Sequence, residues 1–91
     1  MGNQNKEITE DKKMPEKKFR AGGITATIWK NEGKDNDGNK TEFNTVGLER
    51  SYKDKNDEWQ KTNTMRLNDL PKVVLVCSKS YEYLVLKKEE E

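Results

Sequence analysis

Aromatic, basic and hydroxyl side chains offer most of the chemistry available in this 91-residue sequence. Aromatic rings stack on unpaired nucleobases, Lys and Arg pair with phosphates, and hydroxyl groups bond to sugars or base edges. Such side chains stand at alternate positions of predicted strands, which suits single-stranded nucleic acid on a sheet face. The alternative is that threonines only favour strands and that Trp29 packs across them. The candidate residues are Thr27, Trp29, Arg50, Tyr52, Lys53, Lys61, Thr62, Thr64 and Arg66.

The sequence has one cysteine and no histidine, which excludes several kinds of site within the chain. A disulfide framework, a Cys/His zinc site and a Ser/His/Asp or Cys/His triad all need residues that are missing. Cys77 lies in an apolar segment, and we expect it to be a buried small hydrophobe. Carboxylates such as Glu49 and Glu58 have no spacing that singles them out for acid–base catalysis. We therefore expect no enzyme activity, cofactor, metal site or small-molecule substrate.

Glycine-containing segments indicate turns rather than ligand loops. Residues 30–40 are rich in Gly, Asn and Asp, and Asp37-Gly38 is a strong hairpin signal. The segment does not fit a calcium-binding EF-hand loop, because no glutamate follows its glycine at the required spacing. Gly22-Gly23 runs on into a strand and does not fit a phosphate-binding loop.

Three segments have the composition of strands: 18–32, 41–54 and 58–67. In the first, the alternation of apolar residues changes phase across Gly22-Gly23, which predicts one kinked strand or two short ones. In the second, Gly47 lies opposite the apolar face and leaves room for a close neighbour. In the third, Trp59, Met65 and Leu67 share a face. The opposite face of that strand would hold Gln60, Thr62, Thr64 and Arg66.

The segment 67–88 is the longest apolar stretch, and its spacing predicts a helix. The broad core-facing side would hold Leu70, Val73, Val74, Cys77, Tyr81, Leu84 and Val85. A helix that is apolar on more than one side usually has more than one packing partner. We therefore expect self-association through Leu75, Val76, Lys79, Tyr83 and Leu86. Lysines and a glutamate inside the segment argue against a membrane span.

The sequence predicts one small domain, residues 18–88, after a disordered tail of residues 1–17 and before a frayed acidic end, residues 89–91. Only 30% of residues are hydrophobic and 38% are charged, so a core of about 70 residues is marginal and dimerisation is a common remedy. The formal net charge of +1 does not indicate a partner. No apolar signal sequence follows the N-terminus, and we expect a cytoplasmic protein.

Hairpin signals followed by a helix predict an α+β fold: a twisted antiparallel sheet of three to four strands, with one long C-terminal helix packed on one face. A five-stranded OB-type barrel is the alternative fold. The order of elements, with the polar stretch TNTMRLNDLPKVV leading into the helix, resembles the single-stranded-DNA-binding domain of the transcriptional coactivator positive cofactor four and its prokaryotic relatives, a whirly-type fold. The resemblance implies a homodimer, joined through its helices, that binds single-stranded DNA on its sheets. A protein-binding adaptor without nucleic-acid binding is the alternative function.

Overall fold

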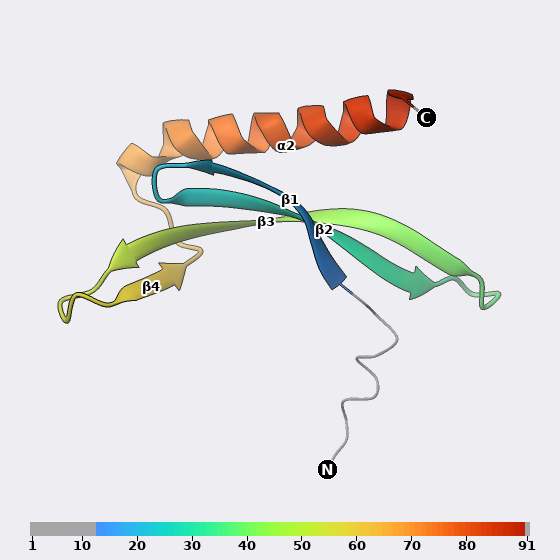
Figure 1. The fold of residues 1–91 in the computed structure, drawn as a ribbon, viewed down its shortest axis with the longest axis horizontal. Coiled ribbons are helices and arrows are strands. Elements are labelled where there is room, and N and C mark those ends of the chain that lie inside the picture. Colours follow the sequence, from blue (N-terminus) through green and yellow to red (C-terminus); the bar gives the residue numbers. More distant parts are fainter. Residues whose placement is uncertain (1–12, 91) are drawn as a thin grey trace, which may run out of the picture.

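The computed structural model describes residues 13–90, and side chains through Lys87. Four strands, β1 (Lys13–Ala21), β2 (Ile24–Lys34), β3 (Lys40–Lys53) and β4 (Trp59–Thr62), pair in sequence order into one antiparallel sheet. A single 3₁₀ turn, η1 (Leu67–Asp69), leads into the helix α2 (Leu70–Glu90), which lies across one face of the sheet (Figure 1). The predicted α+β arrangement is therefore confirmed, with four strands.

The ends of the domain differ from the predicted boundaries. The predicted tail covered residues 1–17, but β1 begins at Lys13; the part of the tail before residue 13 lies outside the described residues. At the other end α2 continues to Glu90, so two of the three residues predicted to fray are helical. Within residues 13–90 no helix is long and apolar enough to cross a membrane.

Short turns join the strands. Gly22 adopts a positive φ of 61°, which favours glycine, so the predicted phase change is a hairpin turn between β1 and β2. Asp35 and Asp54 shape the two later turns, since one carboxylate oxygen of each accepts two backbone N–H groups at 2.9–3.0 Å. These hydrogen bonds hold the pKa of both carboxyls below the usual range.

The core lies between β2 and α2. Ile24, Ala26 and Val76 are buried together, and Phe19, Ala21, Leu48, Met65 and Val73 pack around them. Ser80 is also buried, and its hydroxyl donates to the carbonyl of Val76 at 2.8 Å. The small side chains of Ala26 and Ser80 let the helix lie close to the strand, and the internal hydrogen bond satisfies the hydroxyl.

The helix meets the sheet with only part of the side that the sequence predicted: Val73 packs against the core as expected, but four other predicted core residues do not. Val76 is 2% exposed, whereas Val74 is 63% and Tyr81 70% exposed, and Leu70 and Cys77 are also exposed. The prediction of core positions is therefore wrong for Leu70, Val74, Cys77 and Tyr81. It is also wrong for Val76 as a dimer contact. Both sides of the helix are apolar, so periodicity alone could not decide which side meets the sheet.

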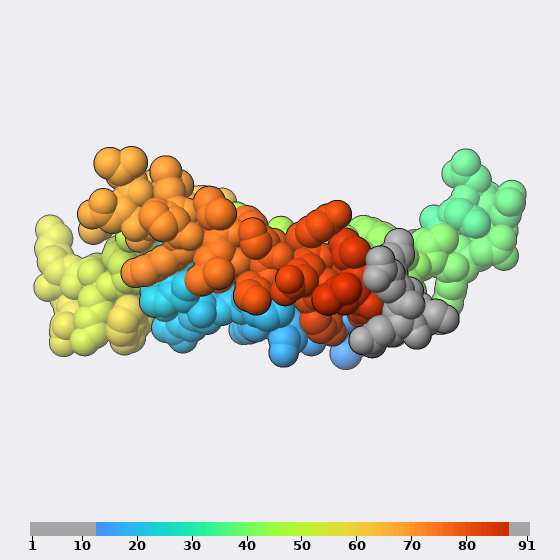
Figure 2. Space-filling view, turned by 90° about the horizontal axis from the view of Figure 1, so that it is seen from above, coloured from blue at the N-terminus to red at the C-terminus, as the bar shows by residue number. Residues whose placement is uncertain are grey.

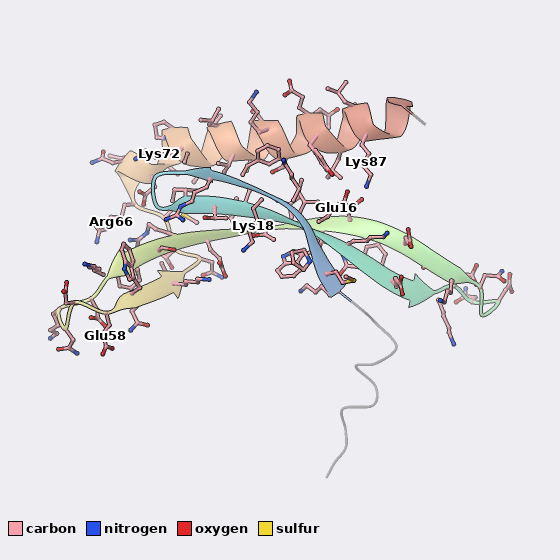
Figure 3. All side chains as sticks on the ribbon, viewed as in Figure 1. Glu16, Lys18, Glu58, Arg66, Lys72 and Lys87 are labelled. Atoms are coloured by element: carbon pink, nitrogen blue, oxygen red, sulfur yellow. The ribbon has the colours of Figure 1, made fainter. Side chains whose placement is uncertain are left out.

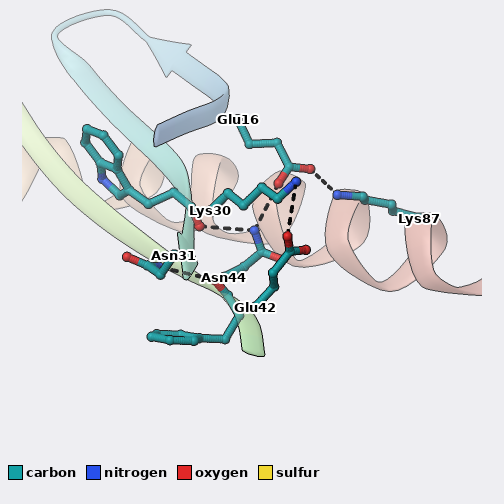
Figure 4. A network of polar contacts seen from close by, with 8 residues as sticks. Glu16, Lys30, Asn31, Glu42, Asn44 and Lys87 are labelled. Carbon is teal, nitrogen blue, oxygen red and sulfur yellow. Dashed lines mark hydrogen bonds and ion pairs between the residues drawn. The ribbon is translucent and has the colours of Figure 1, made fainter. Parts of the chain in front are cut away.

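A polar cluster fixes the C-terminal half of the helix to the strands (Figure 4). Glu16, at the bulge of β1, accepts hydrogen bonds from Asn44 of β3 and from Tyr83 at 3.0 Å each, and pairs with Lys87. The Tyr83 ring also packs edge-on against Phe19, with ring centroids 6.2 Å apart. The bond from Lys87 is the main cause that lowers the pKa of Glu16. Tyr83 therefore faces inward rather than toward a partner.

The domain is open in shape. Its radius of gyration is 16.5 Å, against about 12 Å for a compact chain of this length. The β2–β3 and β3–β4 hairpins extend beyond the helix at opposite ends of the molecule (Figure 2). The helix therefore covers only the middle of one sheet face.

Candidate functional site

The sheet face turned away from α2, here called the open face, is defined by strand alternation and register. Trp29 pairs with Thr45, Thr27 with Lys18 and Gly47, and Ser51 with Lys61. Figure 3 shows Lys18 on the side of the strands away from the helix, whereas Glu16 and Lys87 lie between the strands and the helix. The open face holds Lys13, Lys18, Arg20, Thr25, Thr27, Trp29, Asn31, Phe43, Thr45, Gly47, Glu49, Ser51, Lys53, Trp59 and Lys61.

A hollow of about 690 Å³ lies on this face. Its lining combines one aromatic ring, basic and hydroxyl groups and a carboxylate. These groups belong to Lys18, Thr27, Trp29, Glu49, Lys61 and Thr62. Gly47 and Asn63 also line the hollow. A smaller hollow of about 200 Å³ shares four of these residues and reaches Arg20. The two hollows together extend the polar surface across all four strands.

Trp29 stands at the end of the larger hollow. The pyrrole edge of its indole lies against Gly47: a Cβ built at position 47 would be 3.4 Å from Nε1 and 3.9 Å from Cδ1 of the ring. The ammonium of Lys13 lies 5.1 Å from the centroid of the indole. The ring is therefore half-buried beside a glycine, with a cation over it, in a place where an unpaired base can stack.

Trp59 provides a second aromatic surface near the β3–β4 turn. It is 66% exposed and pairs across the strands with Lys53, whose ammonium lies 5.5 Å from its ring centroid. The sequence predicted Trp59 on the core side of its strand, and the structure places it on the open face. The prediction assumed a strand of residues 58–67, whereas β4 is only four residues long and pairs Lys61 with Ser51.

The charge of the open face is strongly uneven. Lys13, Lys18, Arg20, Lys53 and Lys61 project from its strands, against one carboxylate, Glu49, among the strand residues that the structure describes. Glu49 pairs with Lys61 at 3.8 Å, and both side chains are more than half exposed. Although the net charge of the chain is +1, the strand residues of this face carry more cations than carboxylates; Lys53 is also paired with Asp57 of the β3–β4 turn at 3.4 Å. The arrangement of charges, rather than their excess, produces a surface that attracts phosphates.

Arg50 and Tyr52 lie on the opposite side of β3 from Lys53 and are not part of this surface. The guanidinium of Arg50 donates from Nε to the carbonyl of Thr64 at 3.0 Å and lies 3.4 Å from Asp69. It also lies over the Tyr52 ring, 5.2 Å from the centroid. With 13% of its side chain exposed, Arg50 holds β3 to the strand–helix connection, away from the face on which it was predicted to bind.

The remaining predicted residues divide between the hollow and the connection. Thr27, Trp29, Lys61 and Thr62 line the hollow, although strand alternation turns Thr62 toward the helix side. Thr64 and Arg66 follow the end of β4 in the connection to η1, where the backbone N–H of Arg66 donates to Asp69 at 2.8 Å. Both are exposed but belong to no strand.

The sequence pattern did not lead us to predict several residues of the open face as binding residues. Lys18 and Arg20 were not considered because the phase change at Gly22-Gly23 was not resolved into a hairpin. Once that turn is placed, Lys18 falls opposite Thr27 and Arg20 opposite Thr25. Phe43, which is 53% exposed, shares the face with Asn31 by the same alternation. A hairpin at glycine followed by strict alternation was the signal that could have found them.

Among the side chains that the structure describes, those of residues 13–87, no cluster of three or more Cys, Asp or Glu is placed to hold a metal ion. The chain matches no protein-family model, no curated protein and no solved structure. The site is thus described by its geometry alone: a cationic sheet face with two exposed or half-buried tryptophans and a central hollow.

Proposed function

We propose that the chain binds single-stranded nucleic acid on the open face, with low overall sequence specificity. The observation that carries the proposal is the pairing of two tryptophans with lysines on a face whose described strand residues include five basic residues and one carboxylate. Stacking of a base on an aromatic ring contributes about 1–3 kcal/mol and tolerates any base. Phosphates between stacked bases would meet the lysines and arginine.

Single strands suit this surface better than duplexes. In a duplex the bases are already stacked on one another, so the rings of Trp29 and Trp59 have no base face to contact. The lysines alone would then give a weaker, purely electrostatic contact. The resemblance of the sequence to the coactivator domain favours DNA over RNA and a role in transcription or replication.

We further propose that two copies of the chain associate through the uncovered side of α2. Leu70, Val74, Cys77 and Tyr81, here called the helix strip, follow one another at spacings of four, three and four residues and are exposed. This is the spacing of a helix–helix seam. The small core, with four buried hydrophobic residues among those described, is consistent with a chain that gains stability from a second copy. Of the residues first expected at the interface, Leu75, Lys79 and Leu86 are exposed, but the helical repeat places them on a different side of α2 from the strip.

A second candidate function is a protein-interaction adaptor. The observation that favours it is the same helix strip, because an exposed apolar seam fits a helix of another protein as well as a second copy. In that case the open face would not need to bind nucleic acid. Oligonucleotide binding and the association state separate these functions.

The first experiment follows tryptophan fluorescence during titration with a thymine oligonucleotide of about 20 bases, at low and moderate salt. We expect saturable quenching that weakens with salt and exceeds the effect of duplex DNA. Trp29→Phe and Trp59→Phe assign the signal to each ring. Absence of a response at low salt would reject nucleic-acid binding and leave the adaptor.

The second experiment measures the association state by sedimentation over a range of concentrations. We expect a dimer that Tyr81→Glu dissociates and Glu82→Gln, a neighbouring exposed change, leaves intact. Cys77 is free, exposed and near the middle of the strip, so a short bismaleimide should join two copies. A monomer at every concentration would show that the strip does not bind its own copy.

A further inference from the structure

Glu49 places a negative charge on a surface that is proposed to bind phosphates. It lies in both hollows of the open face, between Lys18 and Lys61, and about half of its side chain is exposed. A carboxylate there repels any phosphate that approaches the centre of the hollow. The same carboxylate can accept hydrogen bonds from a donor group, and nucleobases carry such donors on their edges.

We propose that the hollow beside Trp29 is a base-reading pocket in which Glu49 selects guanine at one position of the bound strand. The inference rests on the proposed function and adds a preference at a single position. Thr27, buried to 7% exposure, and Gly47 form the floor. Trp29 provides the stacking surface at one end, and Glu49 with Lys61 lies at the other.

Guanine is the base whose donors match a carboxylate. Its unpaired edge carries two adjacent donors, N1–H and the N2 amino group, which the two oxygens of Glu49 can accept side by side. Adenine and cytosine present one amino donor beside a ring nitrogen acceptor, and thymine presents one N–H between two carbonyl acceptors. Because Glu49 accepts and cannot donate when ionised, these three bases each leave one carboxylate oxygen without a partner or facing an acceptor.

Two existing contacts must yield to the base, and both are weak. The ion pair between Glu49 and Lys61 is solvent-exposed, so it gives way readily, and the lysine can then meet a phosphate. The cation–π contact of Lys13 with Trp29 is likewise an exposed one, and a base stack on tryptophan is the stronger interaction. The pocket can therefore open without disturbing the sheet.

The test compares the affinity of the full chain for thirteen-base thymine strands that carry one central guanine, hypoxanthine, cytosine or adenine, or none. Hypoxanthine keeps N1–H but lacks the amino group. We expect the guanine strand to bind about fivefold more tightly than the all-thymine strand, with hypoxanthine between them. Glu49→Gln should abolish the difference. The matched control is Glu42→Gln on the helix side of the same strand, which should retain it.

The outcomes separate the inference from the function on which it rests. If every strand binds equally and Glu49→Gln strengthens all of them alike, Glu49 is only a repulsive charge and the inference is wrong while single-strand binding stands. If no strand binds, both fail together. Circular dichroism of each variant verifies that the exposed substitutions leave the fold unchanged.

Discussion

Gly47 lies against the pyrrole edge of the Trp29 indole, where an added Cβ would be 3.4 Å from the ring nitrogen. This distance is an ordinary contact for a methyl group and too short for a larger, branched side chain. The missing side chain of Gly47 therefore allows the Trp29 ring to occupy this position on the open face. Gly47 was expected from the sequence to leave room for a close neighbour, and the neighbour is this indole.

Replacement of Gly47 by valine should move Trp29 and weaken single-strand binding. Valine favours strands, so the sheet should persist, but its two γ-methyl groups enter the space of the ring. We expect an affinity loss equivalent to about 1–3 kcal/mol, the contribution of one stacked base. Gly47→Ala is the matched control and should bind nearly as well as the natural chain. Equal binding by the valine variant, measured by fluorescence anisotropy of a labelled oligonucleotide, would contradict stacking at Trp29.

Neutralisation of Lys18 should change the salt dependence of binding. Each phosphate contact to a single strand contributes about 0.7 to the slope of log affinity against log salt concentration. We expect Lys18→Gln to lower the slope by about this amount. Lys30→Gln removes a lysine of β2 that pairs with Glu42 on the helix side, and it should leave the slope unchanged. If the two variants behave alike, the phosphates do not follow the open face.

Replacement of Arg50 should reduce stability more than binding. Its guanidinium joins the Thr64 carbonyl and Asp69, and Asp69 also accepts the Arg66 N–H. Arg50→Met keeps the stem but removes the donor to the Thr64 carbonyl and the ion pair with Asp69, at a cost of about 1–3 kcal/mol in the free energy of unfolding. Urea denaturation measures this loss, and oligonucleotide affinity of the folded variant should stay within twofold. A large loss of affinity with unchanged stability would restore Arg50 as a nucleic-acid contact.

The side of the helix that meets the sheet can be tested by a pair of truncations. Val76→Ala leaves a cavity beside Ile24 and Ala26 and should lower the free energy of unfolding by about 2 kcal/mol. Leu75→Ala, at the preceding and half-exposed position, should change the free energy of unfolding by less than about 0.5 kcal/mol. Denaturation at one low protein concentration avoids any contribution from association. The reverse order of effects would place the other side of the helix against the sheet.

The sequence was most informative where one local rule decided the structure. Alternation placed Thr27 and Trp29 on one face, and Asp37-Gly38 predicted a hairpin turn that the β2–β3 pairing contains. It was least informative where two solutions had similar local energies. Val74 and Val76 are equally apolar, and the small buried residues Ala26 and Ser80, which bring the helix close, gave no hydrophobic signal. Trp59 was misplaced because a short edge strand fixes its register through pairing with β3, a tertiary effect.

The Glu16 cluster should make stability depend on pH in the acid range. Hydrogen bonds from Lys87, Asn44 and Tyr83 lower the pKa of Glu16 in the folded state. The unfolded chain, with an ordinary glutamate pKa of about 4.3, therefore binds more protons in this range. The stabilisation from Glu16 is complete above that value and is lost as the pH falls through the lower, folded pKa. Asp35 and Asp54 contribute in the same direction, so the cluster must be isolated by a variant.

Glu16→Gln supplies that variant, because it removes the titrating group and keeps its shape. At pH 7 the natural chain should be the more stable of the two by urea denaturation, and the difference should shrink as the pH falls below about 4. Glu82→Gln, at an exposed helix position paired only loosely with Lys79, should show a much smaller difference at every pH. A gap between the natural chain and Glu16→Gln that stayed constant with pH would mean that the charge of Glu16 does not hold β1 to the helix. The cluster would then act through packing of Tyr83 on Phe19 instead.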